Sequence, residues 1–546
     1  MDSQGSSSAL GATTLWPTRK ADRALALLCL SIVTFSGLLL LTYPFARDQG
    51  IYAVIGEGLV HGKMPYRDLW DVKTPGIFCV FAFAEVLFGH TMVGPRIIEA
   101  FCLFATAFVF VDLGRKYFGD TLVGYIAAAV LSVIHFQMDF WHTSQPETYG
   151  GMLLVWAMWL LSMNGVGRVT LRATIVGLLF GGVVLMKPHL GLCVPWLALS
   201  TIGAPHRECW RSVLRQYLAV VGGIVLVAVC CALWLRLGGA WDIAVWTWRD
   251  FAPGYAMLGS DRTLSQTQGD YYSSLIALTF QISGFIGVGL VLFLSLTQPS
   301  TPERKRFWSL AATTAILALA VLLQHKSFKY HYAAAFPTVA LAAAAGWGAL
   351  WRLAAKAPWR YSALFLCAIV ATYFCRYPVT DLHGTINQRT HLRLKGLFGS
   401  RLSQREETRM AALDVLRTNF DLSNAREVAE WLKKAVAPHE RVLLWGCDSV
   451  IYWLSERDPA SRFIHNIPQR SSWQMRTAQS LYMADVRASV PKAIVVQHGD
   501  DIAAVVGNHD DSASALRGFP ELAQYLQSAY RHAVTIGLFD VYLRQY

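Results

Sequence analysis

Long apolar stretches recur along the first two thirds of the sequence, and they limit the possible fold more than any other feature. A helix needs roughly 17 to 25 predominantly apolar residues to cross a bilayer. About eleven windows reach or approach that length: 24–44, 92–112, 121–136, 147–163, 171–186, 189–202, 214–236, 275–296, 307–323, 332–350 and 360–377. Because 54% of the residues are apolar and only 15% are charged, a soluble chain is excluded. The sequence predicts a multi-span α-helical membrane protein.

Basic residues gather in alternate connections between these windows, as is typical of the cytoplasmic side of a membrane. They are Arg19, Lys20, Arg23; Arg115, Lys116; Arg168, Arg172; Arg207, Arg211, Arg215; Arg304, Lys305, Arg306; Arg352, Lys356 and Arg360. This pattern predicts a cytoplasmic amino terminus and, with an odd number of spans, an outer location for the chain after residue 378. The same clusters account for much of the formal net charge of +12, so the charge indicates no nucleic-acid partner.

Three regions follow from this pattern. A polar tail covers 1–23, a transmembrane domain with an outer loop at 45–76 covers 24–377, and a soluble domain covers 378–546. In the soluble domain, helical and strand periods alternate, which favours a small α/β layer. The predicted helices are 424–436, 449–457 and 520–534, and the predicted strands are 441–446, 492–497 and 539–546.

The turn WGCD at 445–448 follows the first of these strands. Such a turn can hold a ligand in a doubly wound fold, but no glycine-rich nucleotide motif accompanies it. A structural turn is therefore favoured. Cys447 is the one cysteine of ten that lies in the outer domain, so this domain is predicted to hold no internal disulfide.

The outer loop 45–76 concentrates charged residues between two strongly apolar segments. Its charged side chains include Asp48, Arg67, Asp68, Asp71 and Lys73. Residues 50–62 and 65–70 are predicted to form short amphipathic helices on the bilayer surface, with Ile51, Val54, Ile55, Leu59 and Leu69 toward lipid or core. The apolar segment 76–89 is too short to cross and is predicted to be re-entrant or interfacial.

Three other outer places hold ionisable residues close to lipid, where burial is costly unless the groups pair or act. They are His142 and Glu147 in QMDFWHTSQPET, Lys187 in LMKPHLG, and Lys326, Lys329 and His331 in HKSFKYHY. The last cluster breaks the positive-inside pattern, which indicates either a bound anion or contact with anionic headgroups. Lys187 alone is also consistent with a lysine that only snorkels toward the interface.

Together these segments resemble the large membrane glycosyltransferases of the GT-C fold. That group uses polyprenyl-phosphate-linked sugars and includes protein O-mannosyltransferases, lipid A aminoarabinose transferase and rhizobial lipopolysaccharide galacturonosyltransferases. The resemblance extends over nearly the whole chain. It rests on Asp48 after the first span, YRDLWDVKTPG, Arg96 in VGPRIIEAF, Glu147 at the start of the fourth window, LLFGGVVLMKPHLGL, KYHYAAAFPTVALAA and RVLLWGCDSVIYWLSERDPASRF.

The resemblance implies transfer of a hexosyl or pentosyl group from a polyprenyl-phosphate donor to a hydroxyl of a cell-envelope acceptor. The acceptor would be lipopolysaccharide, another glycan, a glycolipid or a protein at the outer, periplasmic face of a bacterial inner membrane. The reaction needs a carboxylate to take the acceptor proton and cations to stabilise the departing phosphate. The implied roles are general base for Asp48; donor-phosphate contact for Lys73, Lys187, Lys329, His331 and Arg96; and substrate or acceptor contact for Glu147, Asp71 and His142.

Each of these residues also has a structural interpretation. Asp48 suits a helix N-cap, Asp71 an ion pair with Lys73 or Arg67, and Glu147 a cap at the start of its span. His142 and His331 also suit ordinary interface positions. Several relatives have two adjacent acids where this chain has Asp48 and Gln49, so no metal is predicted there; the sequence predicts no cofactor and leaves a divalent metal elsewhere open.

Two other classes of function fit part of this pattern. A lipid-linked-glycan transporter or flippase also has many spans, but it more often shows inverted repeats, and no convincing repeat is present. A non-catalytic polysaccharide-assembly protein would keep the outer domain without needing Asp48 and Lys73. The aromatic loop 238–273 fits either an interfacial belt or a lid over the site.

Overall fold

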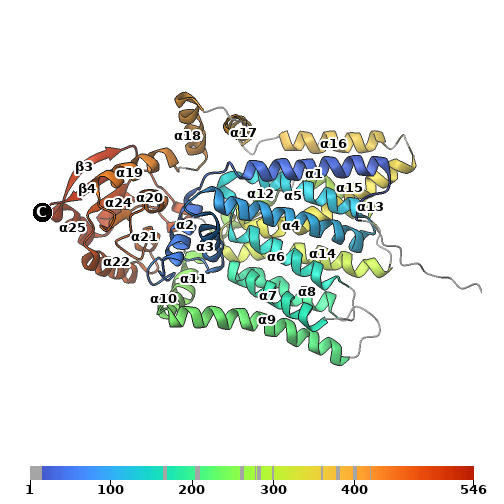
Figure 1. Cartoon of the computed structure of the whole chain (residues 1–546), viewed down its shortest axis with the longest axis horizontal. Helices are drawn as coiled ribbons and strands as arrows, with labels where there is room; N and C mark the ends of the chain where they lie inside the picture. Colours follow the sequence, from blue (N-terminus) through green and yellow to red (C-terminus); the bar gives the residue numbers. More distant parts are fainter. Residues whose placement is uncertain are drawn as a thin grey trace, which may run out of the picture.

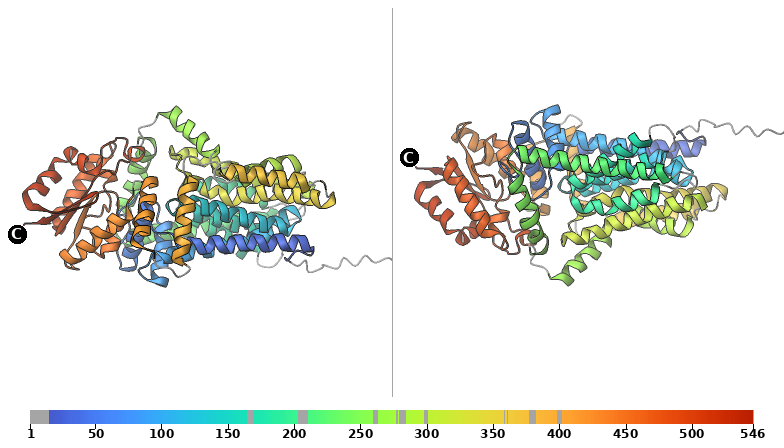
Figure 2. Two further views of the ribbon diagram at one scale, coloured as in Figure 1. Left: turned by 90° about the horizontal axis from the view of Figure 1, so that it is seen from above. Right: turned by 90° about the horizontal axis from the view of Figure 1, so that it is seen from below.

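The computed structural model describes residues 15–163, 169–202, 210–258, 263–276, 278, 284–297, 301–357, 359, 361–376, 382–397, 402–418 and 420–545. Long helices run side by side along the longest axis of the molecule, and a mixed domain of helices and strands covers one end of this bundle (Figures 1 and 2). The first helix begins at the end of the bundle that lies away from this domain (Figure 1). The helical bundle therefore has one bare end and one covered end.

The bundle and its connections are built from helices of very different lengths. The α-helices are α1 (Lys20–Leu40), α4 (Val93–Phe118), α5 (Thr121–His142), α6 (Pro146–Leu161), α7 (Val169–Met186), α8 (Cys193–Thr201), α9 (Trp210–Leu237), α13 (Gly284–Leu296), α14 (Thr301–Ala320), α15 (Phe336–Lys356) and α16 (Tyr361–Arg376). Short 3₁₀ helices η1 (Pro188–Leu192), η4 (Val321–Gln324) and η5 (Lys329–Ala335) interrupt them at the covered end. The connection after α9 holds α10 (Trp241–Trp246), the π-helix η2 (Thr247–Phe251), α11 (Ala252–Met257) and α12 (Leu264–Ile276).

Among the described residues, seven helical segments are long and apolar enough to cross a membrane. They are 20–40, 93–118, 121–142, 169–186, 210–237, 307–324 and 329–356. Each of the remaining predicted windows also contains helix, but α6, α8, α13 and α16 are shorter than a full span. The predicted multi-span helical architecture is confirmed, with seven full-length spans among the described residues where the sequence predicted about eleven.

Glycine allows pairs of helices in the bundle to approach closely. A Cβ added to Gly177 of α7 would lie 2.2 Å from the carbonyl oxygen of Val220 on α9, and one added to Gly223 would lie 2.6 Å from that of Thr174. Gly289 of α13 and Gly346 of α15 are just as crowded by each other's helices. Small residues at such contacts are typical of helices packed inside a membrane, where close backbone approach replaces the hydrophobic effect as the source of packing energy.

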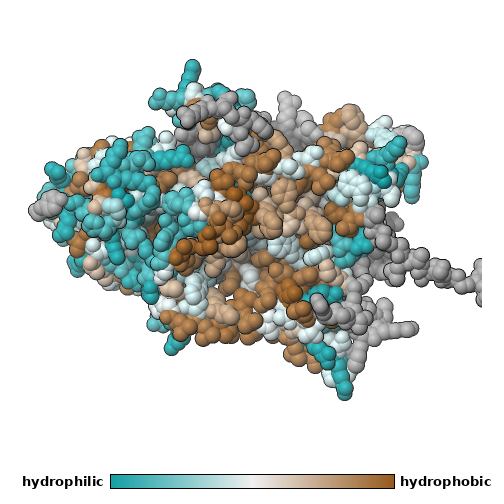
Figure 3. Space-filling model, viewed as in Figure 1, coloured by the Kyte–Doolittle hydropathy of each residue, from teal (hydrophilic) through white to brown (hydrophobic). Residues whose placement is uncertain are grey.

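The surface of the molecule divides in the same way. Apolar residues cover the helical bundle, whereas polar residues cover the domain at its end (Figure 3). Helix α9 exposes a continuous series of large apolar side chains, among them Leu214, Leu218, Val221, Val225 and Leu226. An apolar surface of this extent is stable only against lipid or another protein. Its position on the bundle fits the predicted membrane half of the chain.

The loop after α1 forms α2 (Arg47–Val60) and α3 (Gly76–Phe88). The apolar side of α2 faces the protein core, because Ile51, Val54 and Ile55 are buried. The predicted helix at 65–70 is wrong: this segment is a turn, in which Tyr66 has a positive φ of 68°. The carboxylate of Asp68 accepts a hydrogen bond from the Met64 backbone N–H at 2.8 Å, and this local bond competes with helix formation.

The domain at the end of the bundle contains a four-stranded sheet in the order β1-β2-β4-β3. The strands are β1 (Val442–Trp445), β2 (Ala493–Gln497), β3 (Tyr530–Ile536) and β4 (Phe539–Arg544). β1 pairs in parallel with β2, with Leu443 opposite Ile494, whereas β4 is antiparallel to both of its neighbours. The helices are α17 (Leu382–Leu397), α18 (Gln404–Thr418), α19 (Leu422–Ala435), α20 (Val450–Ser455), α21 (Ile467–Arg470), α22 (Met475–Ser489), α23 (Ala503–Val506), α24 (Ser512–Ala515) and α25 (Pro520–Ala529), with the 3₁₀ helix η7 (Leu516–Gly518).

This arrangement confirms the predicted α/β layer with one change of boundary. The predicted helix 520–534 ends at Ala529, and its last residues belong to β3. The segment from Tyr530 to Ile536 contains Val534, Thr535 and Ile536, whose branched side chains favour a strand. It pairs with β4 as a hairpin, which helix-like periodicity in the sequence did not reveal.

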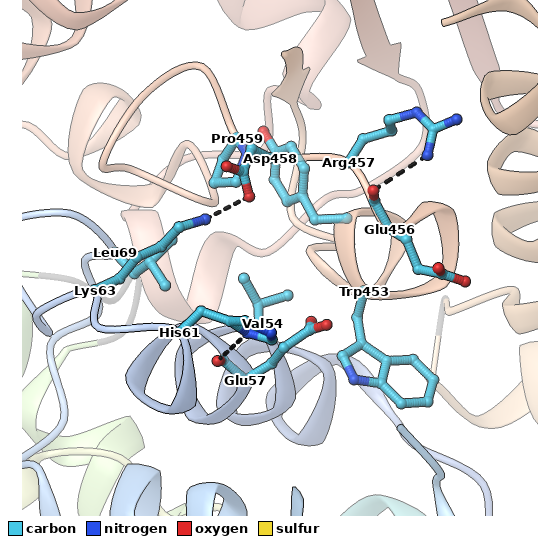
Figure 4. A pocket seen from close by; sticks show the side chains of 12 residues that line it. Val54, Glu57, His61, Lys63, Leu69, Trp453, Glu456, Arg457, Asp458 and Pro459 are labelled. Atoms are coloured by element: carbon cyan, nitrogen blue, oxygen red, sulfur yellow. Dashed lines mark hydrogen bonds and ion pairs between the residues drawn. The ribbon is translucent and has the colours of Figure 1, made fainter. Parts of the chain in front are cut away.

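A polar groove of about 410 Å³ separates α2 from the C-terminal domain (Figure 4). Glu57 and His61 of α2 line one side, and Trp453 and Asp458 line the other. Lys63 forms an ion pair with Asp458 across the groove (Figure 4). The groove therefore marks a junction that charged pairs hold together.

Beside this groove, His90 links α2 and α3 to the C-terminal domain. Its ring stacks on Trp453 with centroids 3.8 Å apart, and its Nδ1 lies 3.3 Å from Glu57 Oε1 and 3.9 Å from Glu85 Oε1. Burial disfavours the imidazolium, but the hydrogen bond and charge of Glu57, with Glu85, raise the pKa of His90 above its ordinary value. A protonated His90 therefore favours the folded junction.

A His90→Gln variant is expected to lose more stability in acid than in base. A group whose pKa is raised by folding contributes stability below its unfolded pKa, here 6.5, and that contribution disappears as the pH rises through the folded pKa. The half-exposed pair limits the loss in thermal midpoint to about 1 to 2 °C at about pH 5.5, with a smaller loss at about pH 8.5. Thermal unfolding of the wild type and the His90→Gln variant in detergent measures this loss in thermal midpoint. Equal losses at the two pH values would contradict the raised pKa of His90.

Candidate active site

An apolar cavity of about 650 Å³ lies at the covered end of the bundle. Its walls come from the loop after Asp71, the ends of α7 and α9, the aromatic connection α10–α11, and the segment η4–η5. Leu185, Ala228, Leu235, Trp241 and Trp248 are among its apolar lining residues. A cavity of this size and character suits an amphiphile, whose apolar part the walls would bury.

Three lysines line this mostly apolar cavity: Lys73, Lys187 and Lys326. Lys187 pairs with Glu147 and donates a hydrogen bond to Gln324 Oε1 at 2.6 Å. Lys326 is 5% exposed and donates to the backbone oxygen of Ala504 at 2.8 Å. Cations in an apolar environment attract an anion more strongly than they would in water. The cavity therefore suits an amphiphile with an anionic head.

Asp48 and Lys73 meet at the edge of this cavity. Lys73 Nζ lies 3.6 Å from Asp48 Oδ1, and it also lies 5.1 Å from the centre of the Tyr52 ring. The other oxygen of Asp48 accepts a hydrogen bond from Gln145 Nε2 at 3.2 Å. Gln145 is itself fixed, because its Oε1 accepts a 2.8 Å hydrogen bond from the Tyr52 hydroxyl. Asp48 is held by two partners while about a quarter of its side chain, 26%, stays exposed.

Asp48 does not cap its helix. The N-cap of α2 is Ala46, and Asp48 lies within the first turn, where a negative charge favours the helix dipole. Gln49 performs the capping function, since its Oε1 accepts a hydrogen bond from the Ala46 backbone N–H at 3.1 Å. Asp48 is therefore not the N-cap of α2, and its side chain contacts Lys73 instead.

Asp71 lies on the other side of Lys73, with its Oδ2 at 3.5 Å from Nζ. Its Oδ1 lies 3.2 Å from Nε2 of His465 in the C-terminal domain. Burial would raise the pKa of Asp71, but Lys73 and the hydrogen bond from His465 hold it below its ordinary value. Burial would lower the pKa of Lys73, but Asp48 and Asp71 raise it above its ordinary value. Asp48, Lys73 and Asp71 therefore form a row of alternating charges at the cavity.

Glu147 lies in the first turn of α6, completely buried. Its Oε1 contacts Lys187 and lies 3.9 Å from His331 Nε2. Its Oε2 is buried and has no hydrogen-bond partner within the part of the chain that the structure describes. A second contact holds His331, whose Nδ1 lies 2.8 Å from the Lys326 carbonyl oxygen. Both His331 and Glu147 therefore lie beside the lysines, and their predicted roles in donor and acceptor binding remain predictions.

Three predicted site residues lie elsewhere. Arg96 is fully buried and binds Glu99 at 3.0 Å and Thr143 Oγ1 at 2.9 Å, within a network behind α2. His142 and Lys329 line a small separate pocket. The ring of His142 approaches the cavity through Tyr330, at 5.7 Å between ring centres. Their predicted contacts with donor or acceptor remain predictions.

Several residues of the cavity were not singled out from the sequence. They are His189, Gln324 and Tyr330. Lys326 and Tyr255 also line the cavity, and the sequence had placed them only in the outer cationic cluster and in the aromatic loop. Lys326 was visible as a member of the outer cationic cluster. It lies in the irregular stretch before η5, directly after His325 with its positive φ of 50°, and the sequence did not reveal which lysine of the cluster lines the cavity. Tyr255 belongs to the aromatic loop 238–273, whose described part lines the cavity with Trp241, Trp248 and Tyr255; Lys326 Nζ lies 4.5 Å from the centre of the Tyr255 ring.

Lys326→Gln is expected to weaken binding of an anionic lipid to the cavity by about tenfold, because one charge-assisted contact is lost. Lys329→Gln, in the same short segment, is expected to change binding by less than about twofold, because Lys329 does not line the cavity. Titration of purified protein with a polyprenyl phosphate in detergent measures both dissociation constants. Equal losses for the two variants would show that the segment acts only through its net charge.

One group of side chains has the spacing of metal ligands among the residues described. Ligand atoms of Glu57, Glu85 and His90 all lie within 4.8 Å of one another. None of the three lines the cavity or contacts Asp48. The carboxylate at the site, Asp48, is instead paired with the Lys73 ammonium.

The C-terminal domain also holds the helix that carries Asp48. Arg47 Nε donates to Asp448 Oδ1 at 2.8 Å, and Asp448 Oδ2 accepts from Gln497 Nε2 at 2.7 Å. Gly50 lies so close to α20 that an added Cβ would be 2.7 Å from the Val450 Cβ. The turn WGCD, which contains Asp448, is thus a structural turn that anchors α2.

Comparison with known proteins supports the fold. The family model "Dolichyl-phosphate-mannose-protein mannosyltransferase" matches residues 72–234. The crystal structure of ArnT from Cupriavidus metallidurans bound to undecaprenyl phosphate aligns with a TM-score of 0.60 and 11% identity over 94% of this chain and 97% of that chain. ArnT from the same organism in the apo state aligns with a TM-score of 0.56 and 11% identity over 96% and 98%. No curated protein matches the sequence.

At this identity the likeness concerns the fold, and it extends over almost the whole of both chains. The family match begins one residue before Lys73 and ends within α9, so it includes Lys73, Glu147 and Lys187. The GT-C fold that the sequence resembles is therefore confirmed.

Proposed function

We propose that this chain is an integral membrane glycosyltransferase that moves a sugar from a polyprenyl-phosphate donor to a hydroxyl of a cell-envelope acceptor. The observation that carries the proposal is the apolar cavity lined by Lys73, Lys187 and Lys326, with the carboxylate of Asp48 at its edge. An apolar wall suits the prenyl chain, and the lysines suit the phosphate. The match to ArnT bound to undecaprenyl phosphate supports a donor of this class.

In the proposed reaction, the acceptor hydroxyl oxygen attacks the anomeric carbon of the sugar with inversion. Asp48 takes the hydroxyl proton, and the electron pair of the breaking carbon–oxygen bond goes to the phosphate oxygen. The donor phosphodiester carries one negative charge and the released polyprenyl phosphate carries two, so charge develops at the phosphate. Lys73 and Lys187 stabilise this developing charge, which is the kind of electrostatic contribution that lowers a barrier most.

The acceptor approaches from the exposed side of Asp48. Glu147 suits a substrate contact, because its buried Oε2 has no hydrogen-bond partner among the described residues and a sugar hydroxyl would supply one. Asp71 and His142 complete the proposed substrate contacts. The acceptor is a lipopolysaccharide, another glycan, a glycolipid or a protein at the periplasmic face of a bacterial inner membrane, where the C-terminal domain would also lie.

The decisive experiment supplies purified protein in detergent with radiolabelled polyprenyl-phosphate sugars and cell-envelope acceptors. Transfer of label, together with loss of one sugar mass from the envelope glycans of cells that lack the gene, would support the proposal and identify donor and acceptor. Binding of the lipid without any transfer would instead indicate a flippase or an assembly protein. Absence of both binding and transfer would contradict the proposed site.

A further inference from the structure

The C-terminal domain reaches into the loop that carries Asp71 and Lys73. The backbone N–H of Trp70 donates to the Arg462 carbonyl at 2.6 Å, and Trp70 pairs with Phe463 as an isolated parallel bridge. The Trp70 ring is fully buried, 5.3 Å from the ring of Phe463 and 5.7 Å from that of His465. This short pairing fixes the register between the two segments, and it places His465 against Asp71.

Within the described parts of the chain, the side chain of His465 has one hydrogen bond, and that bond goes to the site. The side chain is 1% exposed, and Nε2 lies 3.2 Å from Asp71 Oδ1. Nδ1 is buried without a hydrogen-bond partner among the residues described. A buried imidazole that leaves one nitrogen unsatisfied is unfavourable on its own, so a residue chosen only for packing would more readily be apolar. The contact with Asp71 is therefore the distinctive property of His465.

This contact changes how strongly Asp71 binds Lys73. Asp71 has two oxygens, and His465 holds one of them, so only Oδ2 faces Lys73, at 3.5 Å. A full charge-assisted bond between an ammonium and a carboxylate is shorter, at about 2.7 to 2.9 Å. Asp48 is also distant from Nζ, at 3.6 Å. Lys73 is thus surrounded by carboxylates that steady it without closing on it.

We propose that His465 is a positioning residue for sugar transfer: by holding Asp71 back, it leaves the Lys73 ammonium available to the donor phosphate. The C-terminal domain is then part of the active site and not only an appendage of the membrane half. This inference rests on the function proposed above. Without His465, Asp71 would turn both oxygens toward Lys73 and compete with the phosphate for it.

The test compares His465→Leu, which removes the hydrogen bond, with His465→Gln, which keeps an N–H donor at similar reach. The control is His498→Leu, because His498 forms a 2.8 Å contact with Asp540 in the same domain, with 42% of its side chain exposed, and this pair does not include Asp71. Binding of undecaprenyl phosphate and the KM and kcat of donor turnover are measured for the full-length protein in detergent.

In His465→Leu, the Kd for undecaprenyl phosphate and the donor KM are expected to rise about tenfold, with kcat changed less than about twofold. His465→Gln and His498→Leu are expected to stay within about threefold of the wild type. A folded His465→Leu protein with unchanged Kd and KM would overturn the proposal. The proposal would also be overturned if the Leu and Gln variants showed the same rise in KM and the same fall in kcat, because such a result indicates a general packing defect.

A second measurement keeps the proposal testable if His465→Leu folds poorly. Once Asp71 is replaced by Asn, no carboxylate remains for His465 to restrain. His465→Phe, which keeps a ring and removes the N–H donor, is therefore expected to raise Kd about tenfold in the wild-type background and less than about twofold in the Asp71→Asn background. An undiminished effect in that background would overturn the proposal. Failure of the wild type to bind undecaprenyl phosphate and to transfer sugar would instead refute the proposed function itself, so the two failures are distinguishable.

Discussion

Replacement of Asp48 by asparagine is expected to lower the rate of sugar transfer by about 10²- to 10⁴-fold, the usual loss for a well-placed general base. Asparagine has nearly the same volume and can still accept the hydrogen bond from Gln145, but it cannot take the acceptor proton. Because one negative charge beside Lys73 is lost, donor binding is expected to be unchanged or slightly tighter. The reaction should therefore lose kcat and retain its affinity for the donor.

The measurement is turnover of a labelled donor, with the Kd for undecaprenyl phosphate determined on the same preparation. Asp68→Asn is the matched control in the same loop, because Asp68 pairs with Arg67 at the surface and does not line the cavity. It is expected to stay within about twofold of the wild type. Undiminished transfer by the Asp48→Asn protein would refute the assignment of Asp48 as the base.

The second large effect is expected for Lys73→Met, which should lower kcat/KM by about 10²- to 10³-fold. Lys73 is the cation that both Asp48 and Asp71 contact. Removal of the Lys73 ammonium takes away a phosphate contact. It also leaves the negative charges of Asp48 and Asp71 uncompensated, so the anionic donor is repelled. Unlike Asp48→Asn, this variant should lose donor affinity as well as rate.

The Kd and the turnover rate of the same donor distinguish Lys73→Met from Asp48→Asn. Lys63→Met is the matched control, since Lys63 comes from the same loop but pairs with Asp458 across the polar groove. It is expected to remain within about threefold of the wild type. If Lys73→Met bound undecaprenyl phosphate as tightly as the wild type, Lys73 would not be a phosphate contact.

The sequence revealed the features that depend on residues close together in the chain. Apolar length predicted where helices lie, because crossing a bilayer requires consecutive apolar residues. The charged loop predicted Asp48 and Lys73 together, because both follow the first span within one short connection. Lys187 and Glu147 could be placed at the same end of the bundle from the alternation of basic connections, and the structure brings them into contact.

The features that sequence missed depend on contacts between distant segments or on local backbone details. Asp71 and His465 are 394 residues apart in the chain, and no period or spacing relates them. Lys326 lines the cavity and Lys329 does not. The backbone between them is an irregular stretch after His325, whose φ is 50°, and it has no period from which the directions of the two side chains follow. The turn at 65–70 forms because the Asp68 side chain offers the backbone an alternative to a helix.

The first turn of α2 has a consequence for how such chains can change over time. Arg47 binds the C-terminal domain and its neighbour Asp48 faces the cavity, so two adjacent residues serve two halves of the protein. An exchange of C-terminal domains between related chains would disturb Asp48 unless the partners of Arg47 and Asp71 were exchanged with them. The membrane half and the C-terminal domain are therefore expected to be inherited together, as a single unit of descent.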